Sequence, residues 1–134
     1  EYARMEKSSK QGTANSTNVN VTWETVELDT LGSIADTGNN RFEIPSDFSV
    51  AIVHVGISWG DNSSGQRVIR IKKNGSPQAL VQYVPKFNSG NTLSTGPIPV
   101  TAGDLIDVEV FQNSGGTLNV QNDDVTFFGI EVIE

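Results

Sequence analysis

The last third of the sequence constrains the fold most. Residues 105–112 alternate apolar with polar or acidic side chains, a turn-rich segment follows at 113–124, and the chain closes on an apolar, aromatic run at 125–133. Alternation with a period of two is typical of a β-strand that has one buried face. The chain is therefore predicted to end in two strands joined by a Gly/Asn-rich loop. In the first of these strands, the side chains expected in the core are Ile106, Val108 and Val110.

The same period runs through the middle of the chain. Residues 48–59 form the longest alternating run, 67–73 a half-exposed strand and 78–84 its return strand. Asn74 and Gly75 between them supply the left-handed backbone of a tight hairpin. The run at 93–100 contains two prolines. Because proline cannot donate to a ladder, this strand is predicted at a sheet edge or with a bulge.

The run at 48–59 has two different faces. One face is fully apolar, whereas the other carries Ile52 and His54 beside a glycine and a serine. A strand with one fully and one partly apolar face fits a place between a core and a second buried surface. The mixed face therefore indicates a contact between subunits. The residues of the fully apolar face are Ala51, Val53, Val55, Ile57 and Trp59.

The first part of the chain is less regular. Residues 2–8 and 41–44 are predicted as short strands, 29–40 as a loop, and 19–28 as one strand with a bulge. The buried set expected in 19–28 is Val21, Trp23, Val26 and Leu28. No helix and no internal repeat is predicted. Many short strands joined by Gly, Asn and Ser turns indicate a sandwich, a jelly roll or a barrel.

Composition excludes several classes of function. A chain of 134 residues predicts a single domain, 1–134. The absence of cysteine excludes a disulfide scaffold, a thiolate zinc site and a cysteine nucleophile. A net charge of -7 argues against binding to nucleic acid or anionic lipid. No run is apolar enough for membrane insertion, and no secretory signal is visible. The start at Glu1 indicates a processed product, an expressed fragment or the end of a larger protein.

Five stretches, in this order, resemble the C1q/TNF-like jelly-roll family, and the resemblance covers nearly the whole chain. They are residues 3–5, 22–26, 41–45, 103–110 and 127–130. Residues 112–120 resemble the bacteriophage and bacterial versions of the family more than the animal ones. The chain departs from the family at 46–50, where a Gly-x-Tyr is common and Phe48 stands in the aromatic position without the glycine.

The resemblance implies an all-β, antiparallel jelly-roll sandwich of about ten strands that assembles as a homotrimer. It also implies a role in recognition or structural capping. Because a fold alone does not fix function, the ligand does not follow from the resemblance. The residues predicted to line the trimer interface are Ile52, His54, Tyr83, Phe128 and Ile130.

The sequence does not predict an enzyme or a cofactor. His54 is the only histidine, no Gly-x-Ser-x-Gly motif is present, and a nucleophile beside a base and an orienting group is missing. Residues 61–64 and 122–124 are rich in oxygen ligands, but neither has the spacing of a calcium loop, and turn chemistry explains them better. Metal binding, calcium included, is therefore not predicted. Aromatic rings can stack on sugars, and the candidates are Tyr83, Phe87 and Trp59. All three are expected in the core or in the trimer interface instead.

Topology indicates where a ligand would bind. If the last six strands alternate in direction, the loops 60–66, 86–91 and 113–124 meet at one end, opposite the tight turns at 74–75 and 101–103. Adaptable polar loops on a rigid sandwich are where binding sites usually lie. The residues predicted to contact a ligand or receptor are Asp61, Asn62, Ser63, Ser64, Phe87, Asn88, Asn91, Asn113, Ser114, Asn122, Asp123 and Asp124.

The predicted function is a non-enzymatic trimeric module that recognises a host cell-surface glycan or protein as the tip of a phage tail fibre. One alternative is a capsid decoration protein that binds phage capsid proteins at threefold sites. A second alternative is a monomeric carbohydrate-binding module. The first two place the chain in a virion; an extracellular or cell-surface location is the other prediction.

Overall fold

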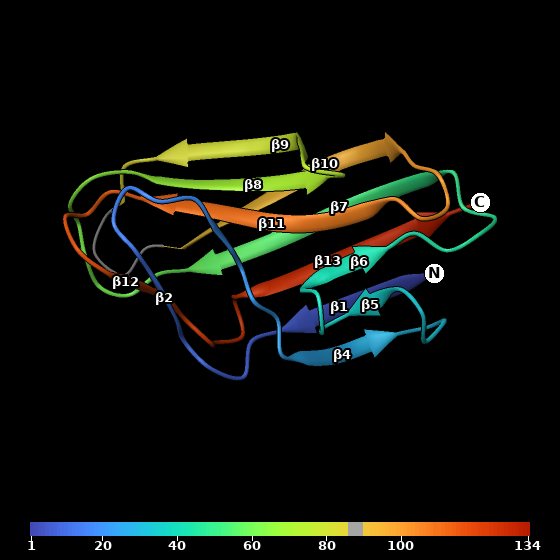
Figure 1. The fold of residues 1–134 in the computed structure, drawn as a ribbon, viewed down its shortest axis with the longest axis horizontal. Helices are drawn as coiled ribbons and strands as arrows, with labels where there is room; N and C mark the ends of the chain where they lie inside the picture. The colour runs from blue at the N-terminus through green and yellow to red at the C-terminus, as the bar shows by residue number, and fades with distance from the viewer. Residues whose placement is uncertain (86–89) are drawn as a thin grey trace.

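Antiparallel strands account for all the regular secondary structure in the residues that the computed structural model describes, 1–85 and 90–134 (Figure 1). The strands are β1 (Tyr2–Glu6), β2 (Gln11–Thr13), β3 (Val19–Asn20), β4 (Thr25–Asp29), β5 (Ala35–Asp36), β6 (Arg41–Glu43), β7 (Val50–Ser58), β8 (Arg67–Lys73), β9 (Ser76–Tyr83), β10 (Gly90–Pro99), β11 (Leu105–Gln112), β12 (Leu118–Val120) and β13 (Phe127–Ile133). About ten were predicted. Two of the short ones, β5 and β12, lie in segments predicted as loops.

Two main sheets face each other across the core. The five-stranded sheet has the order β10-β7-β13-β1-β4, and the six-stranded sheet has the order β5-β6-β11-β8-β9 with β3 paired to β11. A third, two-stranded sheet joins β12 to β2. Strand β13 lies between β7 and β1, so the end of the chain forms the middle of the five-stranded sheet. This arrangement is an all-β jelly-roll sandwich, as predicted.

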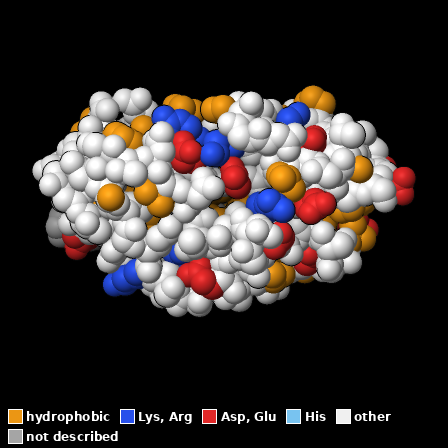
Figure 2. Space-filling view, viewed as in Figure 1, with side chains coloured by type: hydrophobic (Ala, Val, Ile, Leu, Met, Phe, Trp, Pro, Cys, Tyr) orange, Lys and Arg blue, Asp and Glu red, His pale blue; other side chains and the backbone are white. Residues whose placement is uncertain are grey.

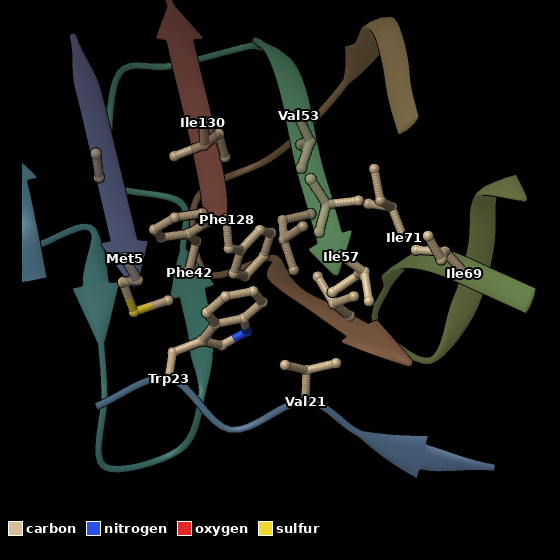
Figure 3. Close-up of a cluster of buried hydrophobic side chains, with 14 of the residues drawn as sticks. Met5, Val21, Trp23, Phe42, Val53, Ile57, Ile69, Ile71, Phe128 and Ile130 are labelled. Atoms are coloured by element: carbon tan, nitrogen blue, oxygen red, sulfur yellow. The ribbon is translucent and has the colours of Figure 1, made fainter. Parts of the chain in front are cut away.

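The core is formed by the side chains that alternate inward from both sheets (Figure 3). The predicted apolar face of 48–59 is confirmed, because its four residues on β7 are 0% exposed and Trp59, directly after the strand, is 2% exposed. At the centre the ring of Phe128 packs against Phe42 and Trp23, with centroids 4.2 and 5.5 Å away. Tilted aromatic pairs at these separations add about 0.5–1.5 kcal/mol each beyond the area they bury.

The predicted single strand at 19–28 is two strands in different sheets. β3 pairs with β11, whereas β4 pairs with β1 at the edge of the five-stranded sheet. Between them the chain crosses from one sheet to the other, and the N–H of Trp23 donates to the side-chain oxygen of Asn40 (2.8 Å). The prediction that Val26 and Leu28 are buried is wrong, since they are 43% and 47% exposed on this edge strand.

The hairpin predicted at Asn74-Gly75 is confirmed. Both residues have positive φ, 51° and 83°, and they connect β8 to β9 with Lys73 opposite Ser76. The side chain of Asn74 also accepts a bond from the N–H of Leu105 (2.9 Å) and donates to Asp104 (2.8 Å). This last bond is the main cause that lowers the pKa of Asp104. The hairpin is thereby tied to the turn that precedes β11.

Strand β10 has the features that its two prolines predicted. It is the edge of the five-stranded sheet, and its register against β7 shifts between Ser94 and Pro97. The side-chain hydroxyl of Thr95 there accepts a bond from the N–H of Val53 (3.1 Å). The Thr95 hydroxyl thus supplies an acceptor for β7 where the register shifts, and the ladder resumes with Pro97 opposite Ile52 and Pro99 opposite Val50.

Because successive strands alternate in direction, the connections gather at two ends of the sandwich (Figure 1). The loops 60–66 and 113–126 lie at one end, which we call the loop end. Both chain termini, the Asn74-Gly75 hairpin and the 101–104 turn lie at the opposite, terminal end. There the α-amino group of Glu1 donates to the carbonyl of Val132 (3.0 Å). In the described ranges, no helix has the length and apolar character needed to cross a membrane.

Candidate functional site

A shallow groove of about 500 Å³ lies on the outer face of the five-stranded sheet. All five strands contribute to it, so it runs across the sheet. We call this surface the groove face. Its lining includes the exposed or half-buried side chains of Tyr2, Arg4, Leu28, His54, Thr92, Leu93, Ser94, Phe127 and Glu131.

The groove exists because a glycine stands opposite a large side chain in two pairs of the β7–β13 ladder. His54 on β7 faces Gly129 on β13, and Gly56 faces Phe127. A Cβ atom added at Gly129 would lie 3.9 Å from the nearest heavy atoms, both backbone oxygens, so the space above it is open. A Cβ at Gly56 would instead lie 2.6 Å from the Phe127 ring. Gly56 on β7 therefore makes room for the Phe127 ring, and the missing side chain of Gly129 on β13 leaves the groove open beside that ring.

One cation in the groove is already neutralised. The guanidinium of Arg4 lies 4.4 Å from the centroid of the Phe127 ring. Its Nε is 2.6 Å from a carboxylate oxygen of Glu27, and its terminal nitrogen is 3.3 Å from Glu6. Glu131, in contrast, forms no ion pair or side-chain hydrogen bond with any residue in the ranges 1–85 and 90–134.

The outer face of the six-stranded sheet has a different character. Figure 2 shows positive and negative side chains interspersed across its middle. Lys72 contacts Glu109 at 2.9 Å and Asp107 at 4.0 Å, and Arg70 contacts Glu109 at 3.4 Å. Partial burial is the main factor that raises the pKa of Asp107, and Lys72 opposes it. This self-paired charged surface is typical of a solvated face, and the groove face is the more apolar of the two.

The residues predicted for the trimer interface divide between the surface and the core. Ile52 and His54 lie on the groove face, and His54 is exposed. Phe128 and Ile130 are 0% and 3% exposed and point into the core (Figure 3), so their assignment to a subunit contact is corrected. The outward phase of β13 is the one that carries Phe127. Adjacent residues of a strand face opposite sides, and the sequence-based choice took the wrong phase.

Of the aromatic residues considered for sugar stacking, the two that the structure describes, Trp59 and Tyr83, do not form an exposed platform. Trp59 is 2% exposed. Tyr83 is half-buried opposite Arg67 in the β8–β9 ladder, away from the groove, and burial raises the pKa of its hydroxyl. Tyr83 is therefore not a groove residue. Phe87 and Asn88 lie outside the residues that the structure describes.

The remaining candidate ligand residues come together at the loop end. The N–H of Gly60 donates to Asn119 (2.8 Å), and the Asn113 side chain accepts from the N–H of Gln66. These bonds hold the loops 60–66 and 113–126 against each other. Exposed there are Asp61, Ser63, Ser64, Asn113, Asn122, Asp123 and Asp124, whereas Asn62 and Ser114 are half-buried. Asn91 is half-buried within β10, opposite Ile57.

Two buried polar side chains, which the sequence did not single out, fix the loop end. Arg67 is 0% exposed, and its guanidinium donates to the carbonyls of Asn62, Ser64 and Gln66 at 2.8, 2.9 and 3.1 Å. Gln112 is also 0% exposed. Its amide nitrogen donates to the carbonyls of Thr13 (2.9 Å) and Gly116 (2.8 Å), and its oxygen accepts from Ser114. The surface loops are therefore built on a rigid base.

Replacing the buried arginine is expected to destabilise the fold. Arg67→Met removes three hydrogen bonds to loop carbonyls that burial leaves without water, at a cost of about 3 kcal/mol in the free energy of unfolding. Arg70→Met on the same strand removes only a partly exposed ion pair and is expected to cost about 1 kcal/mol or less. Urea denaturation at one fixed protein concentration measures both. Equal losses in the two variants would contradict the role assigned to Arg67.

The described residues offer no constellation for a metal ion. Within 1–85 and 90–134, no group of three His, Asp or Glu side chains is placed to hold one. The Asp29 carboxylate, which faces several N–H groups, accepts bonds from the backbone of Gly32 (2.8 Å), Ile34 (2.9 Å) and Ala35 (2.8 Å). It therefore acts as a turn residue, the role that turn chemistry assigns to such aspartates.

Comparison with solved structures shows the fold. The structure is similar to the Eiger TNF of S. frugiperda (TM-score 0.70, 13% identity, covering 99% of this chain and 92% of that one). It is similar to murine APRIL (0.70, 13%, 98% of each chain). It is also similar to the globular domain of the zebrafish complement 1qA protein (0.61, 15%, 99% and 97%). No protein-family model and no curated protein sequence matches the chain. The chain therefore has the C1q/TNF-like jelly-roll fold.

Proposed function

We propose that the chain is a non-enzymatic recognition module that assembles as a homotrimer through its groove face and contacts its target with its loop end. The contrast between the two outer faces carries the proposal. One face pairs its own charges, whereas the other presents Leu28, Phe127 and Tyr2 around an open groove. Apolar surface gathered around a hollow marks an interaction site.

A second copy of the chain is the occupant that we propose for the groove. The C1q/TNF-like resemblance implies a trimer. The groove also crosses β7, whose mixed outer face was predicted to contact another subunit. The groove face also continues into the exposed apolar side chain of Ile133, which has the same strand phase as Glu131. Three copies in head-to-tail contact close a ring when each rotation is one third of a turn.

The loop end is the recognition surface in this proposal. Its exposed side chains are mainly Asn, Ser, Thr, Gly and Asp, a composition that hydrogen-bonds adaptably to sugars and to protein surfaces. Glu1 lies at the opposite end, so a fibre joined there would leave the loop end free. The resemblance of residues 112–120 to phage and bacterial versions supports a place at the tip of a phage fibre, with a host cell-surface glycan or protein as the target.

Of the two alternative functions, the capsid decoration protein is compatible with the groove face, and the monomeric carbohydrate-binding module is disfavoured by it. A capsid decoration protein would use the same trimer but bind viral proteins at threefold sites, and it remains the second candidate because the groove face serves it equally well. A monomeric carbohydrate-binding module would need an exposed aromatic platform and a wet outer face. The burial of Trp59 and the apolar groove disfavour it.

Matched glutamates at the two ends of the sandwich test the recognition surface. Gly116 at the loop end has no heavy atom within 4 Å of an added Cβ, and Ala102 at the terminal end is exposed. On immobilised bacterial surface polysaccharides, Gly116→Glu is expected to weaken binding about tenfold or more, and Ala102→Glu is expected to leave it unchanged. The reverse pattern would move recognition to the terminal end. Absence of binding by the unaltered protein, together with saturable binding to undecorated phage heads, would favour the decoration protein.

A further inference from the structure

The only histidine of the chain lies in the groove. His54 is exposed on β7 and lines the hollow, opposite Gly129 on β13 and Ser94 on β10. Neither neighbour carries a charge. Imidazole is the side chain whose charge ordinarily changes between pH 5 and 8. A partner that covers the groove therefore covers the imidazole of His54.

The charges that surround His54 are predominantly negative. Within the described residues, β7 and β10 contribute no other charged side chain to the groove face, and Arg4 is shared between two carboxylates. Glu131 is the diagonal neighbour of His54 on β13, because it pairs with Ile52 while Gly129 pairs with His54. The titratable and charged groups that face the imidazole from the packed strands are Tyr2, Arg4 and Glu6 on β1, Glu27 on β4 and Glu131 on β13.

Covering this face therefore leaves Glu131 without a counter-charge from its own chain. A carboxylate that is buried without a partner costs several kcal/mol. Diagonal neighbours on adjacent strands are about 7–8 Å apart at the backbone, which is within reach of long side chains. A protonated His54 can thus meet Glu131 across the ladder, whereas a neutral imidazole leaves that carboxylate uncompensated.

We propose that trimer assembly takes up a proton at His54, which pairs with Glu131 in the covered groove, so that the trimer is tighter in mild acid than at neutral pH. This inference rests on the proposed homotrimer. Its sign follows from linkage: a complex that binds more protons than its free chains becomes more stable as the pH falls. If desolvation of the imidazolium dominated instead, the trimer would weaken in acid.

Sedimentation velocity of the protein across a dilution series at pH 7.5, 6.8 and 6.0 tests the proposal. The chain concentration at half assembly is expected to fall about tenfold from pH 7.5 to 6.0, which corresponds to roughly half a proton taken up per chain. In His54→Gln this pH dependence is expected to disappear. In Glu131→Gln the trimer is expected to be tighter at pH 7.5 and to weaken toward pH 6.0, because the imidazolium then has no partner.

Each contrary outcome has a separate meaning. A trimer whose stability does not change with pH, or weakens in acid, overturns the proton uptake and leaves the trimer standing. A pH dependence that persists in His54→Gln overturns the role of this residue. Monomers at every pH and concentration overturn the proposed trimer itself. Near-ultraviolet circular dichroism of each variant at each pH confirms that only folded chains are compared.

Discussion

A chain that ends at Phe128 is expected not to fold. The truncation deletes 129–134, most of β13, which lies between β7 and β1 in the five-stranded sheet. It removes the buried side chains of Ile130 and Val132, which are 3% and 1% exposed, and leaves β7 and β1 each without most of the pairing on its β13 side. Removing one buried aliphatic side chain costs about 2–5 kcal/mol. The total therefore approaches the whole stability of a domain, about 5–15 kcal/mol.

The matched control for this truncation ends at Ile133. It removes only Glu134, which is exposed, and is expected to change the free energy of unfolding by less than about 0.5 kcal/mol. Near-ultraviolet circular dichroism and urea denaturation of the two truncated chains measure the difference. A soluble, cooperatively unfolding chain ending at Phe128 would contradict the central position of β13.

Gly129→Glu is expected to separate assembly from folding. A side chain at this position enters the groove without meeting the rest of its own chain, because the nearest atoms to an added Cβ are 3.9 Å away. The monomer is therefore expected to keep its stability within about 1 kcal/mol. In a trimer, however, each copy would bury a second carboxylate beside Glu131, and the single imidazole of His54 can neutralise only one of the two, so one stays unpaired at a cost of several kcal/mol per interface. The trimer dissociation constant is expected to rise about a thousandfold or more.

Gly116→Glu is the control for the added charge, since it places the same side chain in open space at the loop end. Light scattering during size exclusion is expected to give the mass of one chain for Gly129→Glu and of three chains for Gly116→Glu. If both variants keep the mass of three chains, the groove face is not the interface. Circular dichroism shows whether Gly129→Glu is folded. If it is not, Thr92→Glu, which adds the same charge at the exposed margin of the groove, is tested in its place.

The core face of a strand could be predicted where polar residues interrupt its opposite face, and it could not be predicted where both faces carry an aromatic ring. The alternation in 48–59 gave the correct core face because the opposite face is interrupted by His54 and Gly56. In β13, Phe127 and Phe128 are adjacent and both phases contain an aromatic ring. Glu131 was the available signal, since it shares a phase with Phe127 and marks that phase as outward.

The errors at Val26 and Leu28 have a related physical origin. An apolar side chain on an alternating strand indicates burial, but the pattern does not distinguish its own core from a surface offered to another molecule. Arg67 and Gln112 were missed for a different reason. Their burial depends on loops that fold over them and on contacts such as that between Gln112 and Thr13, which are 99 residues apart in the sequence. No local pattern encodes such a contact.

The solution mass of the unaltered chain tests homotrimer assembly through the groove face without any substitution. Light scattering during size exclusion, repeated over a hundredfold range of concentration, measures it. We expect the mass of three chains at high concentration, with dissociation toward one chain on dilution if the affinity lies within the range. The mass of a single chain at every concentration would contradict the account.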